Sequence, residues 1–229
     1  MITLLAGIFV FVIAYFLGSI PFGLIIARTQ GIDIREHGSR NIGATNVWRV
    51  LGKKWGLITF ILDVLKGVVA VLLAKWIAAH VFPVANQDLT FAGITAALGC
   101  IIGHTFPVWL GFKGGKGVAT SLGVILGMMP LASLIVLAIW GLVFKTTRYV
   151  SLASIAGAVA LPVVVMALLL LPLPNALGLH GWGNFYFACA AALLVIRRHR
   201  ENITRLVEGT ENRFGTPKPP ISDPMEPQE

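Results

Sequence analysis

The sequence predicts an all-α integral membrane protein with about seven transmembrane helices, and three observations carry that prediction. Of the 229 residues, 56% are hydrophobic and only 12% are charged, whereas soluble domains carry about 25% charged residues. Apolar stretches of membrane-spanning length recur along the chain, and most Lys and Arg residues gather between them. This composition disfavours a soluble enzyme, a disordered chain and a nucleic-acid binder, although the net charge of +8 would suit the last.

Five apolar stretches come close to or exceed the roughly 17–25 residues that cross a bilayer core as helix. They cover residues 3–27, 56–79, 89–103, 149–171 and 182–196. The first stretch has no basic residue before Arg28 and is too long for a signal-peptide core, so we expect a helix that is retained.

Basic residues indicate how these stretches are oriented, because Lys and Arg stay on the cytoplasmic side of a membrane. Sixteen of the 18 cations lie in four segments, and Lys66 and Lys75 are the two exceptions. The four segments cover residues 28–54, 113–116, 145–148 and 197–218. Placing all four in the cytoplasm requires an odd number of spans, an outside amino terminus and a cytoplasmic carboxyl terminus.

Residues 118–144 are the ambiguous part of this topology, because Pro130 interrupts an otherwise apolar run. The run forms either one long kinked helix or two short helices that meet near Pro130. The two-helix interpretation gives seven spans and satisfies the charge rule, although a helix over 118–129 is shorter than the bilayer core.

Residues 1–214 are predicted to form a single membrane domain, and the proline-rich residues 215–229 a disordered tail. Cys100 and Cys189 both lie in apolar runs and are expected to be small buried hydrophobic residues. The sequence suggests no metal site and no cofactor.

Three polar segments lie on the predicted cytoplasmic side, and the first covers residues 37–49. It offers hydroxyl and amide groups and a guanidinium that can grip phosphate in a bidentate manner. The candidates are Ser39, Asn41, Thr45, Asn46 and Arg49. A capped polar turn that carries topogenic charge is an equally good interpretation of this segment taken alone.

The second segment, residues 103–120, is rich in glycine and precedes an expected helix. Glycine allows backbone N–H groups to converge on an anion, and a helix amino terminus favours phosphate. The candidate residues are His104, Lys113, Gly114, Gly115, Lys116 and Gly117. The spacing matches neither a Walker A loop nor a dinucleotide fingerprint, and a glycine turn with two topogenic lysines remains the alternative.

The third segment, residues 197–211, places His199 and Asn202 three positions apart, so that they would share a helix face. A histidine among arginines is otherwise usually a solvated residue at the interface. Within the second apolar stretch, Asp63 and Lys66 are also three apart. We interpret them as a structural ion pair that holds this helix to the polar loops.

Taken together, these segments resemble one family, the bacterial integral-membrane glycerol-3-phosphate acyltransferases that use acyl-phosphate donors (the PlsY family). The resemblance covers nearly the whole chain and includes the runs 18–23, 63–67 and 149–154. One departure is Arg40, where the family more often has glycine in a Ser-Gly-Asn run. Three separate motifs in the same order make the resemblance specific.

The resemblance implies transfer of a fatty acyl group from acyl phosphate to the 1-hydroxyl of glycerol 3-phosphate, which releases lysophosphatidic acid and phosphate. It implies catalytic roles for Ser39, Arg49, His199 and Asn202 and a phosphate cradle around Lys116. It also implies that Glu211 is a structural anchor and that Ser151 lines the site. The expected location is the bacterial cytoplasmic membrane, with transient contact to the enzyme that makes acyl phosphate.

The chemistry of the residues agrees with such a reaction. Two phosphate-bearing substrates require clustered cations, and an acyl phosphate carries its own leaving group, so that no covalent intermediate is needed. The proton of the hydroxyl goes either to His199 or to a substrate phosphate, whose second pKa is about 6. We favour the phosphate, with His199 and Asn202 positioning glycerol 3-phosphate.

Two other classes of protein remain in competition. A transporter for an anionic metabolite would bind its cargo near the bilayer midplane, where this sequence offers only Asp63 and Lys66. A non-catalytic scaffold for lipid enzymes would tolerate loss of Ser39.

Overall fold

The computed structural model describes residues 2–81, 89–171 and 181–215, and within these ranges every regular element is a helix. The first six α-helices are α1 (Ile2–Ser19), α2 (Phe22–Thr29), α3 (Ala44–Leu51), α4 (Lys53–His80), α5 (Leu89–Thr105) and α6 (Val118–Met128). The remaining ones are the 3₁₀ turn η1 (Val108–Leu110), then α7 (Pro130–Thr147), α8 (Val150–Leu169), α9 (Gly183–Arg198) and α10 (Arg200–Val207).

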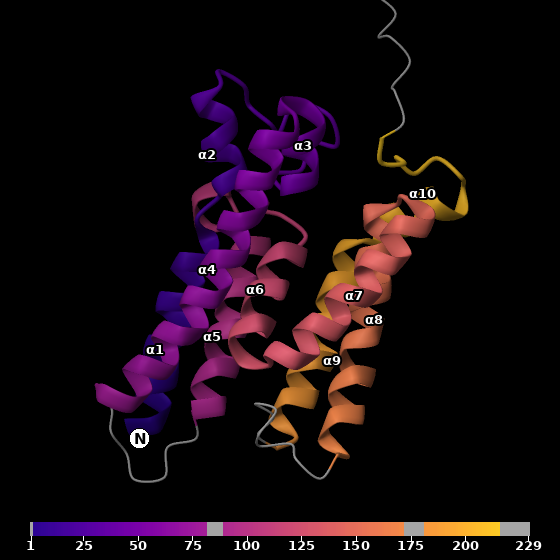
Figure 1. Cartoon of the computed structure of the whole chain (residues 1–229). Helices are drawn as coiled ribbons and strands as arrows, with labels where there is room; N and C mark the ends of the chain where they lie inside the picture. The colour runs from indigo at the N-terminus through magenta and orange to yellow at the C-terminus, as the bar shows by residue number, and fades with distance from the viewer. Residues whose placement is uncertain (1, 82–88, 172–180, 216–229) are drawn as a thin grey trace, which may run out of the picture.

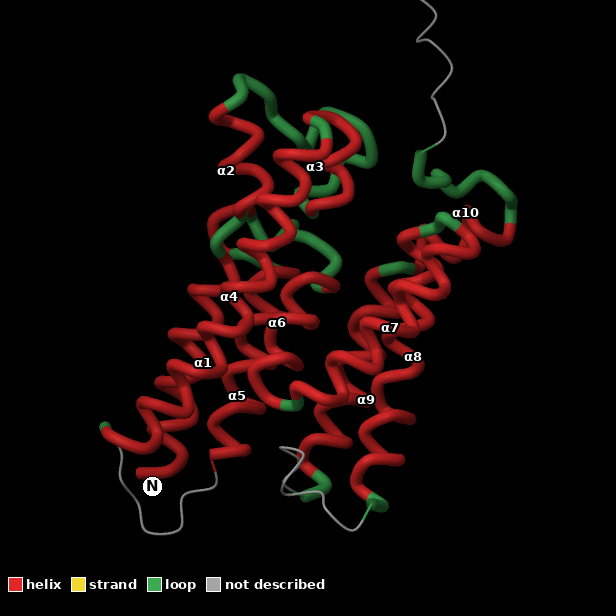
Figure 2. Tube along the Cα trace, in the orientation of Figure 1, coloured by secondary structure: helices red, strands yellow, loops and turns green. Residues whose placement is uncertain are grey.

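The helices form two bundles that stand side by side (Figure 1). In the first bundle α1 packs on α5 and α4 packs on α6, and in the second bundle α8 packs between α7 and α9. The bundles meet where α6 turns into α7 and where α5 touches α9. At the polar end the ribbons of the two bundles diverge, and the loops and short helices gather there (Figure 2).

The run 118–144 consists of two helices, as one of our two interpretations predicted. Met129 adopts a non-helical conformation between α6 and α7, and Pro130 occupies the first position of α7, where its missing N–H is not needed. Among the described residues, five helical stretches are long and apolar enough to cross a membrane, whereas α6 has only 11 residues and α9 only 16. The seven-span topology therefore stays a prediction.

The first apolar stretch is not the single helix we expected. It breaks into α1 and α2 at Pro21, because proline has no N–H to continue the helical hydrogen bonds. Ile20 lies in this break, and its carbonyl accepts hydrogen bonds from the backbone N–H of Phe22 at 3.2 Å and from the ammonium of Lys66 at 2.9 Å. The break thus contains a bonding partner for a buried cation in α4.

Close packing of α1 on α5 depends on glycine. A Cβ atom on Gly18 would collide with the carbonyl of Cys100, and one on Gly103 would collide with the carbonyl of Tyr15. Cys100 is buried as expected, but Cys189 is exposed on α9, so the expectation for Cys189 was wrong. Its apolar surroundings in the sequence belong to a helix face that the bundle leaves uncovered.

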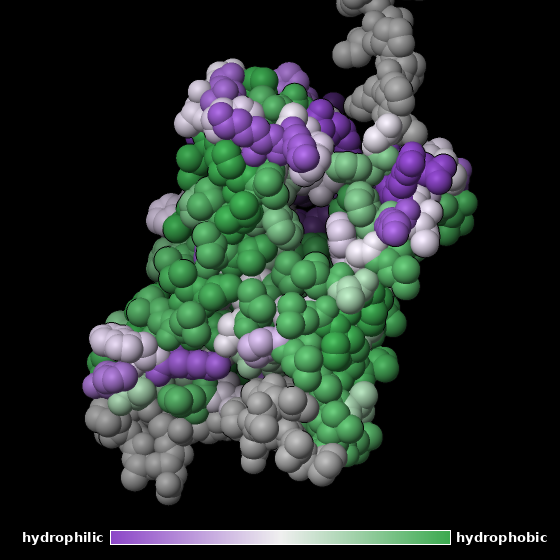
Figure 3. Space-filling model, in the orientation of Figure 1, coloured by the Kyte–Doolittle hydropathy of each residue, from purple (hydrophilic) through white to green (hydrophobic). Residues whose placement is uncertain are grey.

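Hydrophobic side chains cover the flanks of both bundles, and most hydrophilic ones lie at one end, with a smaller patch at the opposite end of the first bundle (Figure 3). Leu4, Leu72, Leu142 and Leu193 are each more than half exposed, which is expected for helices surrounded by lipid. At the polar end, α2 and α3 enclose a small hydrophobic core of their own, which includes Leu24, Ile34 and Val47. This small core supports the first polar segment.

Candidate active site

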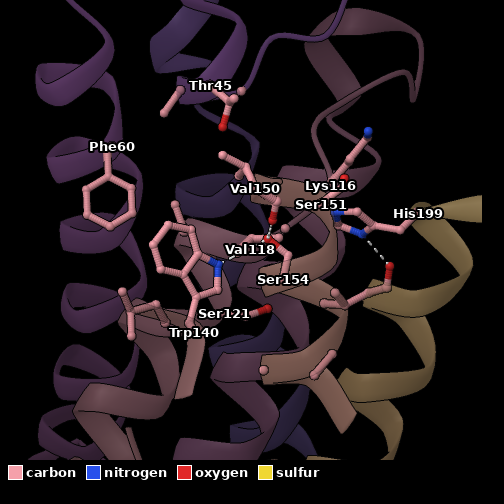
Figure 4. A pocket seen from close by; sticks show the side chains of 18 of the residues that line it. Thr45, Phe60, Lys116, Val118, Ser121, Trp140, Val150, Ser151, Ser154 and His199 are labelled. Carbon is pink, nitrogen blue, oxygen red and sulfur yellow. Dashed lines mark hydrogen bonds between the residues drawn. The ribbon is translucent and has the colours of Figure 1, made fainter. Parts of the chain in front are cut away.

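A cavity of about 570 Å³ lies between the two bundles and opens toward the polar end. The space-filling view shows the hollow between the two hydrophilic caps (Figure 3). One end of the cavity is lined by polar residues of the three segments, and the other by apolar residues of α4 and α6 to α9. Figure 4 shows Lys116, Ser151 and His199 on one side of it, with Phe60 opposite and Trp140 between them.

Thirteen of the residues that we predicted from the sequence line this cavity. They are Ser39, Asn41, Thr45, Asn46, Arg49, Asp63, His104, Lys116, Gly117, Ser151, His199, Asn202 and Glu211. The other four, Lys66, Lys113, Gly114 and Gly115, do not line it. The three polar segments, which are more than 150 residues apart at the extremes, therefore meet at one place.

Asn46 holds the first segment in shape. Its side-chain oxygen accepts a hydrogen bond from the backbone N–H of Ser39 at 2.8 Å, and its amide nitrogen donates to the carbonyls of His37 and Asn41 at 3.0 and 2.9 Å. The side chain is 2% exposed and its hydrogen-bonding capacity is used within the protein. Asn46 therefore holds Ser39 in position, and the substrate-binding role that we expected for Asn46 stays a prediction.

The glycines of the second segment do not form the phosphate cradle that we predicted. The N–H groups of Gly114 and Gly115 already donate to the carbonyls of Thr105 and His104, both at 3.1 Å. A Cβ atom on Gly115 would collide with the imidazole of His104. These glycines are needed for close packing, and their amides are not available to an anion.

Lys116 and Gly117 do lie at the start of a helix, as we predicted. Gly117 has a φ of +81° and immediately precedes α6, a conformation that glycine adopts without strain. The Lys116 ammonium hydrogen-bonds to the side-chain oxygen of Asn202 in the third segment. Burial lowers the pKa of Lys116, and Arg205 lowers it further, although Glu211 opposes both.

Glu211 is the centre of the third segment. Its carboxylate accepts hydrogen bonds from the hydroxyl of Ser151 at 2.8 Å, the amide of Asn202 at 2.7 Å and the guanidinium of Arg205 at 2.7 Å. Burial alone would raise the pKa of Glu211, but these three hydrogen bonds outweigh it and leave the pKa lowered. Glu211 thus ties α8 and α10 together, which agrees with the anchoring role implied by the resemblance.

His199 lies between α9 and α10 and is 3% exposed. Its Nδ1 is 2.8 Å from the carbonyl of Val195, and since a carbonyl only accepts, Nδ1 carries the proton and Nε2 keeps its lone pair. Burial lowers the pKa of His199 to about 4. The imidazole is therefore neutral at pH 7 and is a weak base.

Asp63, Lys66 and His104 form a buried cluster at the wall of the cavity. The Lys66 ammonium lies 2.8 Å from the carboxylate of Asp63 and 3.0 Å from Nδ1 of His104. The expected ion pair therefore exists, and it also fixes the imidazole of His104. Because Lys66 further bonds the carbonyl of Ile20, the cluster joins the break between α1 and α2 to α4 and α5.

Two arginines at the site were missed by sequence reasoning. Arg205 lines the cavity beside Glu211, and Arg198 donates to the carbonyls of Gly114 and Gly115 at 3.2 and 3.3 Å. In the sequence, Arg198 and Arg205 stand out only as members of a run of basic residues. Arg198 connects α9 to the glycine loop, so it holds the second segment against the third.

The lining of the polar end favours an anion as ligand. Arg49, Lys116 and Arg205 face a cavity in which both carboxylates, Asp63 and Glu211, are engaged by cations or hydrogen bonds of the protein. Below this end the walls are apolar, with Leu57, Val136 and Leu161 among them. In a helical membrane protein, such a cavity is suited to an amphiphile with an anionic head and a hydrocarbon tail.

Comparison with known proteins narrows this description to one family. The family model for glycerol-3-phosphate acyltransferase matches residues 8–209. Curated relatives of that name include one from Geobacter sulfurreducens, 46% identical over 88% of this chain and 94% of its own length. Another, from Aquifex aeolicus, is 43% identical over 91% of this chain and 99% of its own length.

Solved structures agree with the sequence comparison. A crystal structure of PlsY, described as an integral membrane glycerol 3-phosphate acyltransferase in its glycerol 3-phosphate form, superposes with a TM-score of 0.76. It is 42% identical and covers 91% of this chain and 96% of its own. A lysophosphatidic acid form of PlsY gives a TM-score of 0.74 with the same identity, over 91% and 95% of the two chains. The chain belongs to the glycerol-3-phosphate acyltransferase family.

Proposed function

We propose that this protein transfers a fatty acyl group from acyl phosphate to the 1-hydroxyl of glycerol 3-phosphate, releasing lysophosphatidic acid and inorganic phosphate. The observation that carries the proposal is a single cavity whose cationic end continues into an apolar slot. Both substrates have a phosphate, and only one has a long hydrocarbon chain. The cavity offers cationic side chains for the phosphates and apolar walls for the hydrocarbon chain in one place.

The reaction needs little covalent chemistry from the protein. The hydroxyl oxygen of glycerol 3-phosphate attacks the acyl carbonyl, the bond between the carbonyl carbon and the phosphate oxygen breaks, and phosphate leaves. Arg49 and Lys116 neutralise charge on the phosphates, and the hydroxyl of Ser39 hydrogen-bonds a phosphate oxygen. Alignment and charge stabilisation therefore account for most of the acceleration.

A substrate phosphate accepts the hydroxyl proton in this mechanism. His199, with a pKa of about 4, is a weaker base than a phosphate monoester, whose second pKa is about 6. The lone pair on Nε2 can instead accept a hydrogen bond from glycerol 3-phosphate, and Asn202 lies one helical turn away. His199 and Asn202 are assigned to positioning of this substrate.

The pH dependence of a His199→Ala variant tests that assignment. We expect its loss of turnover to persist at every pH, because the orienting contact is missing at every pH. Recovery of activity at high pH, or rescue by added imidazole, would identify His199 as the base and refute substrate assistance.

The location follows from the same arguments. We assign the chain to the bacterial cytoplasmic membrane, with seven spans, the amino terminus outside and the active site facing the cytoplasm. Residues 1–214 make up the catalytic domain, and the proline-rich tail from residue 216 onward lies outside the described residues. Transient contact with the enzyme that supplies acyl phosphate would suit a cavity that opens at the cytoplasmic end.

A comparison of two acyl donors tests the proposed reaction. Purified protein is given glycerol 3-phosphate together with either acyl phosphate or acyl-CoA, and lysophosphatidic acid and phosphate are measured. We expect product from acyl phosphate and none from acyl-CoA. Product from acyl-CoA alone would refute the donor assignment. Uptake of phosphate esters into proteoliposomes without any acyl transfer would favour a transporter, and absence of both acyl transfer and uptake would favour a non-catalytic scaffold.

A further inference from the structure

A second hollow, of about 210 Å³, lies on the outer surface where α4, α6 and α7 meet. Nearly all of its lining is aliphatic or aromatic, and Ser133 is the one polar residue. The lining consists of Phe60, Ile61, Val64, Leu65, Leu122, Leu126, Ser133, Leu134 and Leu137. We call this hollow the lateral groove.

The lateral groove and the main cavity share part of their walls. Phe60, Leu122, Ser133 and Leu137 line both. Phe60 is 37% exposed and Leu137 is 41% exposed, so each side chain forms the wall of the cavity and the surface of the bundle at once. A barrier one side chain thick separates the cavity from the outside at this place.

The lateral groove has an apolar surface that would face the hydrocarbon region of a bilayer. Ile61, Leu65 and Leu134 beside it are 46%, 49% and 57% exposed, and its lining contains no titratable group. The central part of the apolar band in Figure 3 includes this face. In a bilayer these side chains contact lipid tails, so a chain that passes through the groove goes from one apolar environment into another.

The dimensions of the main cavity also favour a side exit. From Ser151 at the polar end to Leu161 at the apolar end, the lining of α8 spans ten residues, or about 15 Å along the helix. The shared residue Leu122 lies five residues beyond Gly117, roughly 7 Å below the start of α6. A long acyl chain that starts at the phosphate level therefore passes along the thin wall on its way to the depth of Leu161.

We propose that the acyl chain of the lipid substrate and product passes between α4 and α7 through the lateral groove, so that its far end stays in the bilayer. This inference rests on the proposed function, because it assumes that the main cavity holds an acyl phosphate. Under this proposal, Phe60 and Leu137 control the passage of the acyl chain into the lateral groove. The residues near Leu161 do not limit the length of the acyl chain that the protein accepts. Short chains end before the wall, and long chains cross it.

Substitution of Leu137 by tryptophan tests the proposal, because the larger ring would thicken the thin wall. The measurement is the ratio of kcat/KM for a sixteen-carbon acyl phosphate to that for an eight-carbon one. The matched control is Leu142→Trp, on the same helix, where the side chain is 65% exposed and lines neither hollow. Elution as a single species from a sizing column in detergent establishes that each variant is folded.

We expect the long-to-short ratio to fall at least tenfold in Leu137→Trp and to stay within twofold of wild type in Leu142→Trp. Equal loss at both chain lengths, or an unchanged ratio, would overturn the lateral path. A wild-type profile that drops sharply above a fixed chain length would indicate a closed floor and would also overturn it. Absence of acyl transfer by wild type at every chain length would instead refute the proposed function.

Discussion

The two ends of the main cavity are built in different ways. At the polar end each functional side chain is held by specific bonds, as Glu211 shows with partners on α8 and α10. At the apolar end the walls are mostly helix surfaces in van der Waals contact, where Trp140 donates a hydrogen bond to Ser154 at 3.3 Å. We infer that the polar end depends on the position of single atoms, whereas the apolar end depends on volume.

The largest effect is expected from Arg49→Ala at the polar end. Loss of a hydrogen bond to a charged group costs about 1.5–3 kcal/mol, or roughly 10–150-fold in kcat/KM. The matched control is Lys53→Ala, which removes an exposed charge near the same end but outside the cavity. Steady-state acyl-transfer kinetics measure both, and equal losses would mean that only the overall positive field matters.

Glu211→Gln should have the next largest effect, a fall of about tenfold in turnover. The neutral amide keeps the shape and the oxygen that accepts from Ser151 and Asn202, but it loses the negative charge and the second oxygen that pair with Arg205. Glu208→Gln, an exposed carboxylate near the same end of α10, is the control. Wild-type turnover in Glu211→Gln would show that the network is dispensable.

The lowered pKa of His199 predicts how the stability of the fold changes with pH. Its pKa in the folded protein, about 4, lies below its ordinary 6.5, so between these values the unfolded chain binds more protons. Stability should therefore rise with pH through this window, by at most about 1.4 kcal/mol per pH unit from this residue. Thermal unfolding in detergent should show a weaker pH dependence for His199→Gln than for wild type. An identical dependence would place the titrating group elsewhere.

Trp140→Phe at the apolar end should have the smallest effect, less than about threefold in turnover. The change removes the hydrogen bond to Ser154 but keeps most of the aromatic volume. Ser154 keeps its other hydrogen bond, to the carbonyl of Val150 at 2.7 Å. A loss as large as that of Glu211→Gln would break the distinction between the two ends.

The apolar pattern and the placement of cations were sufficient to predict the class of fold. Pro130 was recognised as a possible helix boundary, and the structure has one there. The break at Pro21 was missed, because the apolar run continues on both sides of this proline and gives no other sign of a helix boundary. Cys189 was misplaced for a related reason, since a membrane helix is apolar on its exposed face as well.

The candidate site was predictable as a set of residues, but not as a network. Ser151 and Glu211 are 60 positions apart, and no local pattern indicates that one bonds to the other. The glycine loop was misjudged because packing glycines and anion-binding glycines look alike in a sequence. The difference depends on where the amides of Gly114 and Gly115 donate, which only the fold decides.

The central claim is that one cavity binds a phosphate at its polar end and a hydrocarbon chain along its apolar end. A structure of this protein with lysophosphatidic acid bound tests it most directly. We predict the phosphate within hydrogen-bonding distance of Arg49 or Lys116, and the chain running past Trp140 toward Phe60 and Leu137. A phosphate bound away from these cations, or a chain lying outside the cavity, would contradict the account.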